Sequence, residues 1–307
     1  MNPVTATLDS LRLGPIQSHL NLSLIPLLSD EPLPQAYLTL DEALERKLVS
    51  ITELTQSGSV PELRFDNLTD EQVLLLDGEE LVGAKQNRVL NITILVGAFA
   101  KIIIPVSCVE RGRWHHLSNE FRSAKRHMFA KARAAKMAQV SMSLRASGSR
   151  RSNQSEVWAE ISAKAERMNA HSATEAMADI YESERPRLDG FEKAFRPLAN
   201  QVGALFAING QILGAELFDS DAAFKKLMGK LVGSYAMDAI EEPVGRPEPV
   251  SPASITAFLE RIKDSSSEAF PAVGEGQDLR LNGRGISGGA LVADGRVVHL
   301  SAFAAEA

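Results

Sequence analysis

Short strand-like segments follow one another between residues 50 and 109, and they constrain the fold of this chain more than any other feature. Apolar and β-branched residues gather at 50–54, 62–67, 72–77, 89–96 and 101–109, with short polar turns between them. Parallel neighbours need a long crossover connection, usually a helix, whereas antiparallel neighbours need only a tight turn. We therefore predict an α+β protein with a mostly antiparallel β-sheet or barrel-like core.

A different pattern begins near residue 115. Residues 118–147 contain no proline and are rich in Ala, Lys, Arg and Met, which predicts a helix, and a second helix is predicted from Asn153 onward. Strand patterns return at 201–219 around the turn Asn209-Gly210, and another helix is predicted at 221–240.

These elements predict a single α+β domain over residues 1–240, interrupted by a basic helical insertion at about 115–200. Four prolines in "EEPVGRPEPVSP" predict an extended linker at 241–254. Residues 255–307 predict a C-terminal helix and a β-hairpin that pack on the core, with the hairpin turning at Asp294-Gly295. Local start signals support two of the helices. They are the capping-box pair Thr39 and Glu42, and Ser251-Pro252.

Two segments share a pattern, "LLLDGEELVGAKQN" and "LFAINGQILGAELF". Each has an apolar strand, an Asp-Gly or Asn-Gly turn, further apolar residues and Gly-Ala. A duplicated unit would explain the likeness, and so would independent use of the same favourable hairpin turn.

The net charge of −6 is unevenly distributed. Residues 111–151 hold eleven Lys or Arg side chains and one acid, Glu120, so this segment carries +10 and the remainder −16. Such a segment is typical of a site for an anion, an acidic protein or nucleic acid. The alternative is a basic surface helix balanced by acidic neighbours in the fold.

Composition also narrows the class of protein. No apolar run reaches the roughly 18 residues that a membrane helix needs, so no membrane partner is predicted. Cys108 is the single cysteine, which excludes an internal disulfide and predicts a cytoplasmic protein. The histidine spacing fits no common zinc motif, so no metal site is predicted. The sequence does not identify a cofactor, and it is compatible with a homo-oligomer.

A polar block interrupts the apolar segment "VLLLDGEELVGAKQNRVLNITILV" (73–96). It consists of Lys85, Gln86, Asn87 and Arg88, with Asn91 close behind. Each buried polar group that lacks a partner costs about 1–3 kcal/mol, so the block is either a solvated turn or a binding site. In a binding site, Gln86 and Arg88 would share a strand face with Leu90 at a barrel mouth or cleft. In a solvated turn, Arg88 would form a surface bridge with Glu79 or Glu80.

A second group of polar residues ends the next strand. The segment "IIIPVSCVERGRW" (102–114) delivers Cys108, Glu110, Arg111, Arg113 and Trp114 to one edge of the sheet. Trp114 could stack on a base or be buried. Cys108 and Arg113 resemble the thiolate cradle of rhodanese-like sulfurtransferases, although a lone cysteine is usually a small buried hydrophobe. We expect both strand ends to converge on a shared hollow.

Together with "VGALFAINGQILGAELFD" and "KLMGKLVGSYAMDAI", these two segments resemble a bacterial domain family. The family is named for its association with ADP-ribosylglycohydrolases and rhodanese-phosphatase superfamily proteins. The resemblance covers roughly residues 15–240 and implies a context in NAD and ADP-ribose metabolism. The family motifs fall on Glu79, Glu80, Lys85, Gln86, Asn87, Arg88, Asn91, Glu110, Arg111, Arg113 and Trp114.

Three functions follow as hypotheses. The first is an enzyme acting on an ADP-ribose-like or other phosphorylated nucleotide. In it, Glu80 or Glu110 acts as general base, and the remaining residues bind the ligand: Lys85, Arg88, Arg111 and Arg113 hold phosphate, and Gln86, Asn87 and Asn91 orient it. The second is a non-catalytic ligand-sensing or protein-interaction module that uses the same pocket and presents residues 118–151 to an acidic partner. The third is sulfur or phosphate transfer through Cys108.

Overall fold

The computed structural model describes residues 2–55, 58–115, 117–243 and 249–305. It confirms the α+β prediction, with mostly antiparallel sheets. The chain forms two compact units that do not follow the order of the sequence. Unit 1 comprises Met1–Gln35, Pro186–Ala272 and Gly276–Ala307, and unit 2 comprises Ala36–Arg185 and Val273–Glu275.

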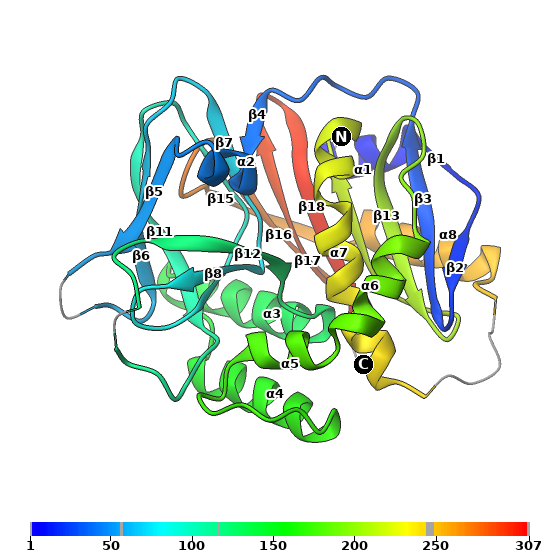
Figure 1. Cartoon of the computed structure of the whole chain (residues 1–307). Coiled ribbons are helices and arrows are strands. Elements are labelled where there is room, and N and C mark those ends of the chain that lie inside the picture. The colour runs from blue at the N-terminus through cyan, green and yellow to red at the C-terminus, as the bar shows by residue number, and fades with distance from the viewer. Residues whose placement is uncertain (1, 56–57, 116, 244–248, 306–307) are drawn as a thin grey trace. The chain divides into compact units, whose positions relative to one another are not determined.

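Unit 1 is built on one antiparallel sheet with the strand order β1-β3-β13-β14-β18-β17-β16-β15, and β2 also pairs with β3 (Figure 1). Its strands are β1 Leu11–Leu13, β2 Gln17–His19, β3 Leu22–Ser29, β13 Gln201–Ile208, β14 Gln211–Phe218, β15 Ser266–Pro271, β16 Gln277–Gly283, β17 Ile286–Ala293 and β18 Arg296–Ala304. The predicted turns at Asn209-Gly210 and Asp294-Gly295 are confirmed, because Ile208 faces Gln211 and Ala293 faces Arg296. The predicted C-terminal hairpin is therefore β17–β18, and β18 continues the sheet beside β14.

Helices cover both faces of this sheet. They are α1 Pro3–Asp9, α6 Arg185–Ala194, α7 Asp221–Glu241 and α8 Pro252–Lys263. Apolar side chains from α1 and α8, such as Leu8 and Phe258, join the strand residues Ile25, Leu205 and Leu300 in one buried core. The opposite face meets α7, where Tyr235 stacks on Phe206 with ring centroids 4.0 Å apart. Part of the predicted linker, residues 244–248, lies outside the described residues.

Unit 2 contains two sheets. In the smaller sheet, β7 Gln72–Leu75 lies between β4 Tyr37–Thr39, which runs parallel to it, and β10 Ile94–Val96, which runs antiparallel. The six-stranded sheet has the order β12-β8-β9-β11-β6-β5, with antiparallel neighbours. Its strands are β5 Val49–Glu53, β6 Glu62–Asn67, β8 Glu79–Gly83, β9 Arg88–Leu90, β11 Lys101–Cys108 and β12 Phe121–His127.

Two predicted elements of unit 2 were wrong. The strand predicted at 89–96 is two strands, β9 and β10, which belong to different sheets. The helix predicted at 118–147 begins only at α3 Ala130–Ser147, because residues 121–127 form β12 and pair with β8. The charged residues of β12 have a high helix propensity. They nevertheless form a strand, because they pair with β8.

The remaining helices of unit 2 are α2 Leu40–Glu45, α4 Gln154–Arg167 and α5 Met177–Ser183. The capping box of Thr39 and Glu42 is confirmed at the start of α2. Asn153 caps α4, and in unit 1 Ser251 caps α8 with Pro252 in its first turn. Among the described helices, none combines the length and apolar character needed to cross a bilayer.

The two look-alike segments fold differently. Asn209-Gly210 closes a true hairpin between β13 and β14. Asp77-Gly78 instead separates β7 from β8, which lie in different sheets. At Gly78 φ is +85°, and a Cβ there would lie 2.7 Å from Arg133 Nε, so both the turn and the neighbour favour glycine. The likeness between the segments is therefore one of turn residues and does not extend to strand pairing.

Candidate functional site

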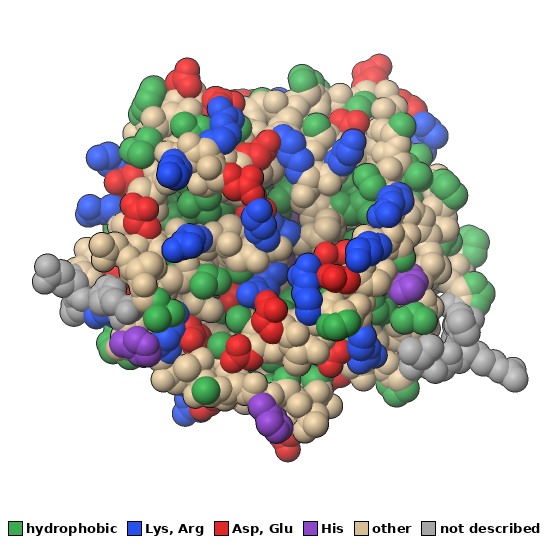
Figure 2. All heavy atoms as spheres, in the orientation of Figure 1, with side chains coloured by type: hydrophobic (Ala, Val, Ile, Leu, Met, Phe, Trp, Pro, Cys, Tyr) green, Lys and Arg blue, Asp and Glu red, His purple; other side chains and the backbone are tan. Residues whose placement is uncertain are grey.

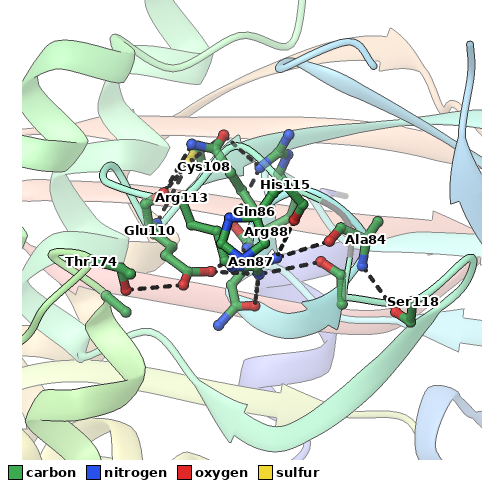
Figure 3. A network of polar contacts seen from close by, with 12 residues as sticks. Ala84, Gln86, Asn87, Arg88, Cys108, Glu110, Arg113, His115, Ser118 and Thr174 are labelled. Atoms are coloured by element: carbon green, nitrogen blue, oxygen red, sulfur yellow. Dashed lines mark hydrogen bonds and ion pairs between the residues drawn. The ribbon is translucent and has the colours of Figure 1, made fainter. Parts of the chain in front are cut away.

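The predicted convergence of two strand ends occurs in unit 2. The chain leaves β8 at Gly83, turns through residues 84–87 and returns as β9, so that Leu81 faces Arg88. On the other side of β9, Arg88 faces Cys108 near the end of β11. The polar block and the 108–114 segment therefore lie side by side, and polar contacts join them (Figure 3).

Arg113 binds the two segments to each other. It is 3% exposed, and its guanidinium donates hydrogen bonds to five acceptors: Ala84 O (2.8 Å), His115 O (3.2 Å), Gly83 O (3.4 Å), Asn87 Oδ1 (3.0 Å) and Glu110 Oε2 (2.6 Å). A planar guanidinium suits such a set because its donors point outward in fixed directions. Arg113 therefore fixes the shape of the turn through Nη1 and Nη2.

Glu110 is held in its ionised form by the same network. Burial raises the energy of its charge, but hydrogen bonds from Arg113, the Asn87 N–H and Thr174 outweigh this and lower its pKa below the ordinary value. The Asn87 N–H lies 3.0 Å from Oε2, and Thr174 Oγ1 lies 3.0 Å from Oε1. Since these bonds stabilise the ionised form and lower its pKa, Glu110 is a weaker candidate for a general base than a carboxyl group whose pKa is raised.

Gln86 and Asn87 connect the buried charges. Gln86 Nε2 donates to the carbonyl oxygen of Glu110 at 3.0 Å, and its Oε1 accepts from Arg88 Nη1 at 3.1 Å. Asn87 Oδ1 accepts from Arg113, and its Nδ2 donates to Glu80 Oε1 at 3.3 Å. Figure 3 shows both amides at the centre of the network, between Glu110 and Ala84.

Glu80 differs from Glu110 in protonation. It is fully buried, and burial raises its pKa to about 7 despite the opposing effects of Arg126 and Asn87. Arg126 Nε lies 2.7 Å from Glu80 Oε2, and its Nη1 lies 3.3 Å from the exposed Glu182. Glu80 is thus a fully buried carboxyl group whose pKa lies near neutral pH.

Arg88 does not form the surface bridge to Glu79 or Glu80 that was the alternative interpretation of the block. It is fully buried, and its nearest carboxylate oxygen is Glu53 Oε1, 3.9 Å from Nη2. Glu79 instead accepts the Leu76 N–H at 2.9 Å. The polar block is therefore part of the protein interior and not a solvated turn.

Cys108 is also buried, and its environment does not activate it. Burial raises the pKa of its thiol, and the charge of Arg88 and the Trp158 indole N–H only partly oppose this. The thiol donates to Gln86 Oε1 at 3.1 Å. A thiolate cradle requires a lowered pKa, so these surroundings give the sulfur-transfer hypothesis no support.

Two of the predicted ligand residues face solvent. Trp114 is 49% exposed, so the alternative of a buried tryptophan was wrong, and Lys85 Nζ lies 5.2 Å from the centroid of its ring. Arg111 has an exposed side chain that lies over the Trp158 ring and 3.7 Å from Glu175. Trp114 and Arg111 therefore lie on the outer side of the network.

Asn91 does not lie with the other residues of the polar block. Its Nδ2 donates to Arg150 O at 3.0 Å, and its Oδ1 accepts from Ser107 Oγ at 2.6 Å. Ser107 also meets Ser152 at 2.6 Å. The hydrogen bonds of Asn91 therefore connect the segment that precedes α4 to strand β11.

Several residues of the site were missed by sequence reasoning. Gln154 both accepts from the Cys108 N–H and donates to the Cys108 carbonyl, each at 2.8 Å, in the manner of an added strand. Arg126, Glu53 and Thr174 supply further contacts from distant parts of the sequence. The only sequence signal near Gln154 was the cap at Asn153, which says nothing of tertiary contacts.

The basic segment is not one exposed helix. Arg133 and Lys136 on α3 are fully buried, and Lys136 donates to Asp77, Leu90 O and Asn91 O. On the face drawn in Figure 2, Lys and Arg side chains lie interspersed with Asp and Glu side chains. Binding of an acidic protein or nucleic acid at residues 118–151 stays a prediction.

A model of one protein family matches residues 10–303, which is nearly the whole chain. The family is described as the ARG and Rhodanese-Phosphatase-superfamily-associated Protein domain. The chain belongs to this family. The match extends the resemblance seen in residues 15–240 to α8 and the C-terminal strands. No curated protein and no solved structure matched the chain significantly.

A groove of about 890 Å³ in this family domain lies against the same turn. It is bordered by α2, β5 and the segment that leads into β12. One wall contains Ser118, whose Oγ accepts the Ala84 N–H at 3.0 Å. Ala84 also accepts from Arg113, so the wall of the groove is joined to the buried network. A hollow of this size is comparable to known small-molecule sites.

Proposed function

We propose that the chain is an enzyme acting on a phosphorylated nucleotide of the ADP-ribose class, with Glu80 as the group that transfers a proton. The observation that carries the proposal is the complete burial of Glu80, which raises its pKa to about 7. A carboxyl group with a pKa near the working pH can both give and take a proton during a reaction. The family description, with its reference to ADP-ribose-related proteins, supports the ligand class.

The neighbours of Glu80 support the same role. Arg126 Nε lies 2.7 Å from Oε2 and Asn87 Nδ2 lies 3.3 Å from Oε1, so the two neighbours fix the orientation of the carboxyl group. Arg126 is partly exposed and is the side of the pair that reaches solvent. Lys85, Arg88 and Arg111 would supply positive charge to a phosphate, while Trp114 offers an exposed ring for a base.

Binding and turnover of ADP-ribose, NAD and nucleotides by the full chain test the proposal. We expect at least one of them to raise the melting temperature and to be converted. Glu80→Gln is expected to keep binding and to lose turnover. Glu182→Gln is the matched control because Glu182 is the exposed partner of the same Arg126. If no compound of this set stabilises the protein, the proposed function is wrong.

A ligand-sensing module is the second candidate. The feature that favours it is the closed character of the network, in which Arg113, Glu110, Gln86 and Asn87 bond mainly to one another. Such a network holds a shape well but leaves few groups for chemistry. Binding without turnover, abolished by Arg88→Ala, would favour this candidate over the enzyme.

A further inference from the structure

The edge of the Arg88 guanidinium formed by Nε and Nη2 carries an inference about the ligand. We infer that this edge is the seat of a phosphoryl group and that the Glu53 carboxylate competes for it. The inference rests on the proposed function for its ligand class, nucleoside phosphates, while the seat itself follows from the contacts of Arg88.

One edge of the guanidinium is already fixed. Arg88 Nη1 donates to Gln86 Oε1 at 3.1 Å and lies 3.5 Å from Asn87 O. Gln86 is itself held by the carbonyl oxygen of Glu110. The plane of the guanidinium is therefore set by the network around it and needs no ligand to orient it.

The other edge has donors to spare. Among the described residues, Arg88 Nε and Nη2 are buried and have no hydrogen-bond acceptor. Glu53 Oε1, at 3.9 Å from Nη2, lies beyond hydrogen-bond distance and also lacks a partner in the described part of the chain. Nε and Nη2 point the same way and are spaced to receive two oxygens of one anion.

The electrostatics of the position agree with an anion. Burial lowers the pKa of Arg88, and the nearby Cys108 and Glu53 oppose this shift. The Cys108 thiol is neutral at pH 7 because burial raises its pKa. Of these two neighbours, Glu53 carries the carboxyl group, and its Oε1 lies 3.9 Å from Nη2, beyond hydrogen-bond distance.

Phosphate is favoured over carboxylate because a second cation, Lys85, and an aromatic ring, Trp114, lie near Glu53, the residue that faces this edge of Arg88. A Cβ at Gly58 would lie 3.2 Å from Lys85 Cδ, 3.5 Å from Glu53 Oε2 and 3.5 Å from Trp114 Cη2. These three side chains therefore gather around Gly58, so Lys85 and Trp114 lie near the carboxyl group that faces Arg88. A phosphoryl group between Arg88 and Lys85 would leave a nucleoside free to contact Trp114.

Calorimetry on the full chain tests the inference with pyrophosphate, ADP, ADP-ribose and adenosine as probes. We expect the three phosphate compounds to bind and adenosine to bind at least about tenfold more weakly. Arg88→Lys keeps the positive charge but loses the two parallel N–H donors of the guanidinium. It is therefore expected to weaken the binding of pyrophosphate by about tenfold or more.

Glu53→Gln provides the decisive measurement, since it remains informative even if Arg88→Lys fails to fold. Removing a competing carboxylate is expected to tighten pyrophosphate binding by about tenfold. Glu71→Gln is the control, because Glu71 pairs with an arginine, Arg46, on the exposed surface of the same unit, and it should leave the affinity unchanged. If Glu53→Gln lowers the melting temperature and leaves pyrophosphate affinity unaltered, Glu53 is the structural partner of Arg88 and the inference fails.

The outcomes also separate this inference from the proposed function. If pyrophosphate binding depends on Arg88 and Glu53 but ADP-ribose is not converted, the phosphoryl site at Arg88 is supported and the proposed enzymatic function is contradicted. If ADP-ribose is converted but neither substitution changes the affinity for pyrophosphate, the enzymatic function is supported and the phosphoryl site at Arg88 is contradicted.

Discussion

Glu110 and Arg113 are three residues apart in sequence, and their side chains meet at 2.6 Å in the protein interior. The pair closes the turn after β11 on itself, while the other donors of Arg113 reach across to the turn before β9. Hydrogen bonds therefore join the two turns into one rigid structure. This structure holds Gln86 in place and, through Gln86, the guanidinium of Arg88.

Arg113→Lys is expected to destabilise the protein strongly. Lysine has three donors on a flexible stem and cannot serve five acceptors in fixed directions, so Glu110 is left as a buried, poorly paired charge. We expect a loss of about 3–5 kcal/mol in the free energy of unfolding, measured by urea denaturation. Arg111→Lys, on the exposed neighbour, should change it by less than about 1 kcal/mol. Equal effects of the two substitutions would contradict the role of Arg113 in joining the two turns.

Glu80 predicts a pH dependence of stability. Its pKa in the folded protein, about 7, is above the ordinary value of 4.5, so the folded state binds this proton more tightly than the unfolded chain. The stabilisation is complete below about pH 4.5 and is lost as the pH rises through 7. Its size is on the order of 3 kcal/mol.

Unfolding curves recorded from pH 4 to pH 8 measure this contribution. Glu80→Gln should flatten the dependence, whereas Glu182→Gln should keep the wild-type slope, because Glu182 is exposed. A slope that persists in Glu80→Gln would assign the effect to another group.

Gly78→Ala is expected to cost more than its backbone conformation alone explains. Both Gly78 and Gly148 have positive φ, +85° and +70°, but only at Gly78 would a Cβ meet a neighbour, at 2.7 Å from Arg133 Nε. We expect about 1 kcal/mol for Gly148→Ala and a further 1–3 kcal/mol or so for Gly78→Ala. Urea denaturation compares the two variants, and similar losses would mean that Arg133 moves aside freely.

Cys108 should resist modification in the folded protein. Its thiol is buried and its pKa is raised by that burial, so little thiolate is present and reagents cannot reach it. We expect alkylation by iodoacetamide at pH 8 to become fast only in urea, as followed by mass spectrometry. Rapid alkylation of the native chain, or loss of activity in Cys108→Ser, would revive the transfer hypothesis.

Local chemistry made part of this structure predictable. The cap at Ser251, the capping box at Thr39 and the hairpin at Asn209-Gly210 each depend on residues within four positions of one another. Convergence of the two strand ends was also predictable, because antiparallel neighbours bring adjacent segments together. These features need no knowledge of distant partners.

Other features depended on distant partners and could not be read in this way. Residues 121–127 have the composition of a helix, yet they form β12 because β8 offers them a pairing edge. Lys136 belongs to a basic run that reads as a solvated surface, yet its ammonium group is buried against Asp77, far away in the sequence. The nearest carboxylate to Arg88 is that of Glu53, a residue that no spacing rule connects with it.

The discontinuous make-up of unit 1 also affects how the chain emerges from the ribosome. Strand β3, which is apolar along most of its length, pairs with β13, and more than 170 residues separate the two in synthesis. Almost all of unit 2 is made within that interval. A nascent chain halted near residue 190 is therefore expected to carry most of unit 2 together with a β3 that can pair with β1 and β2 but whose β13 edge is still exposed.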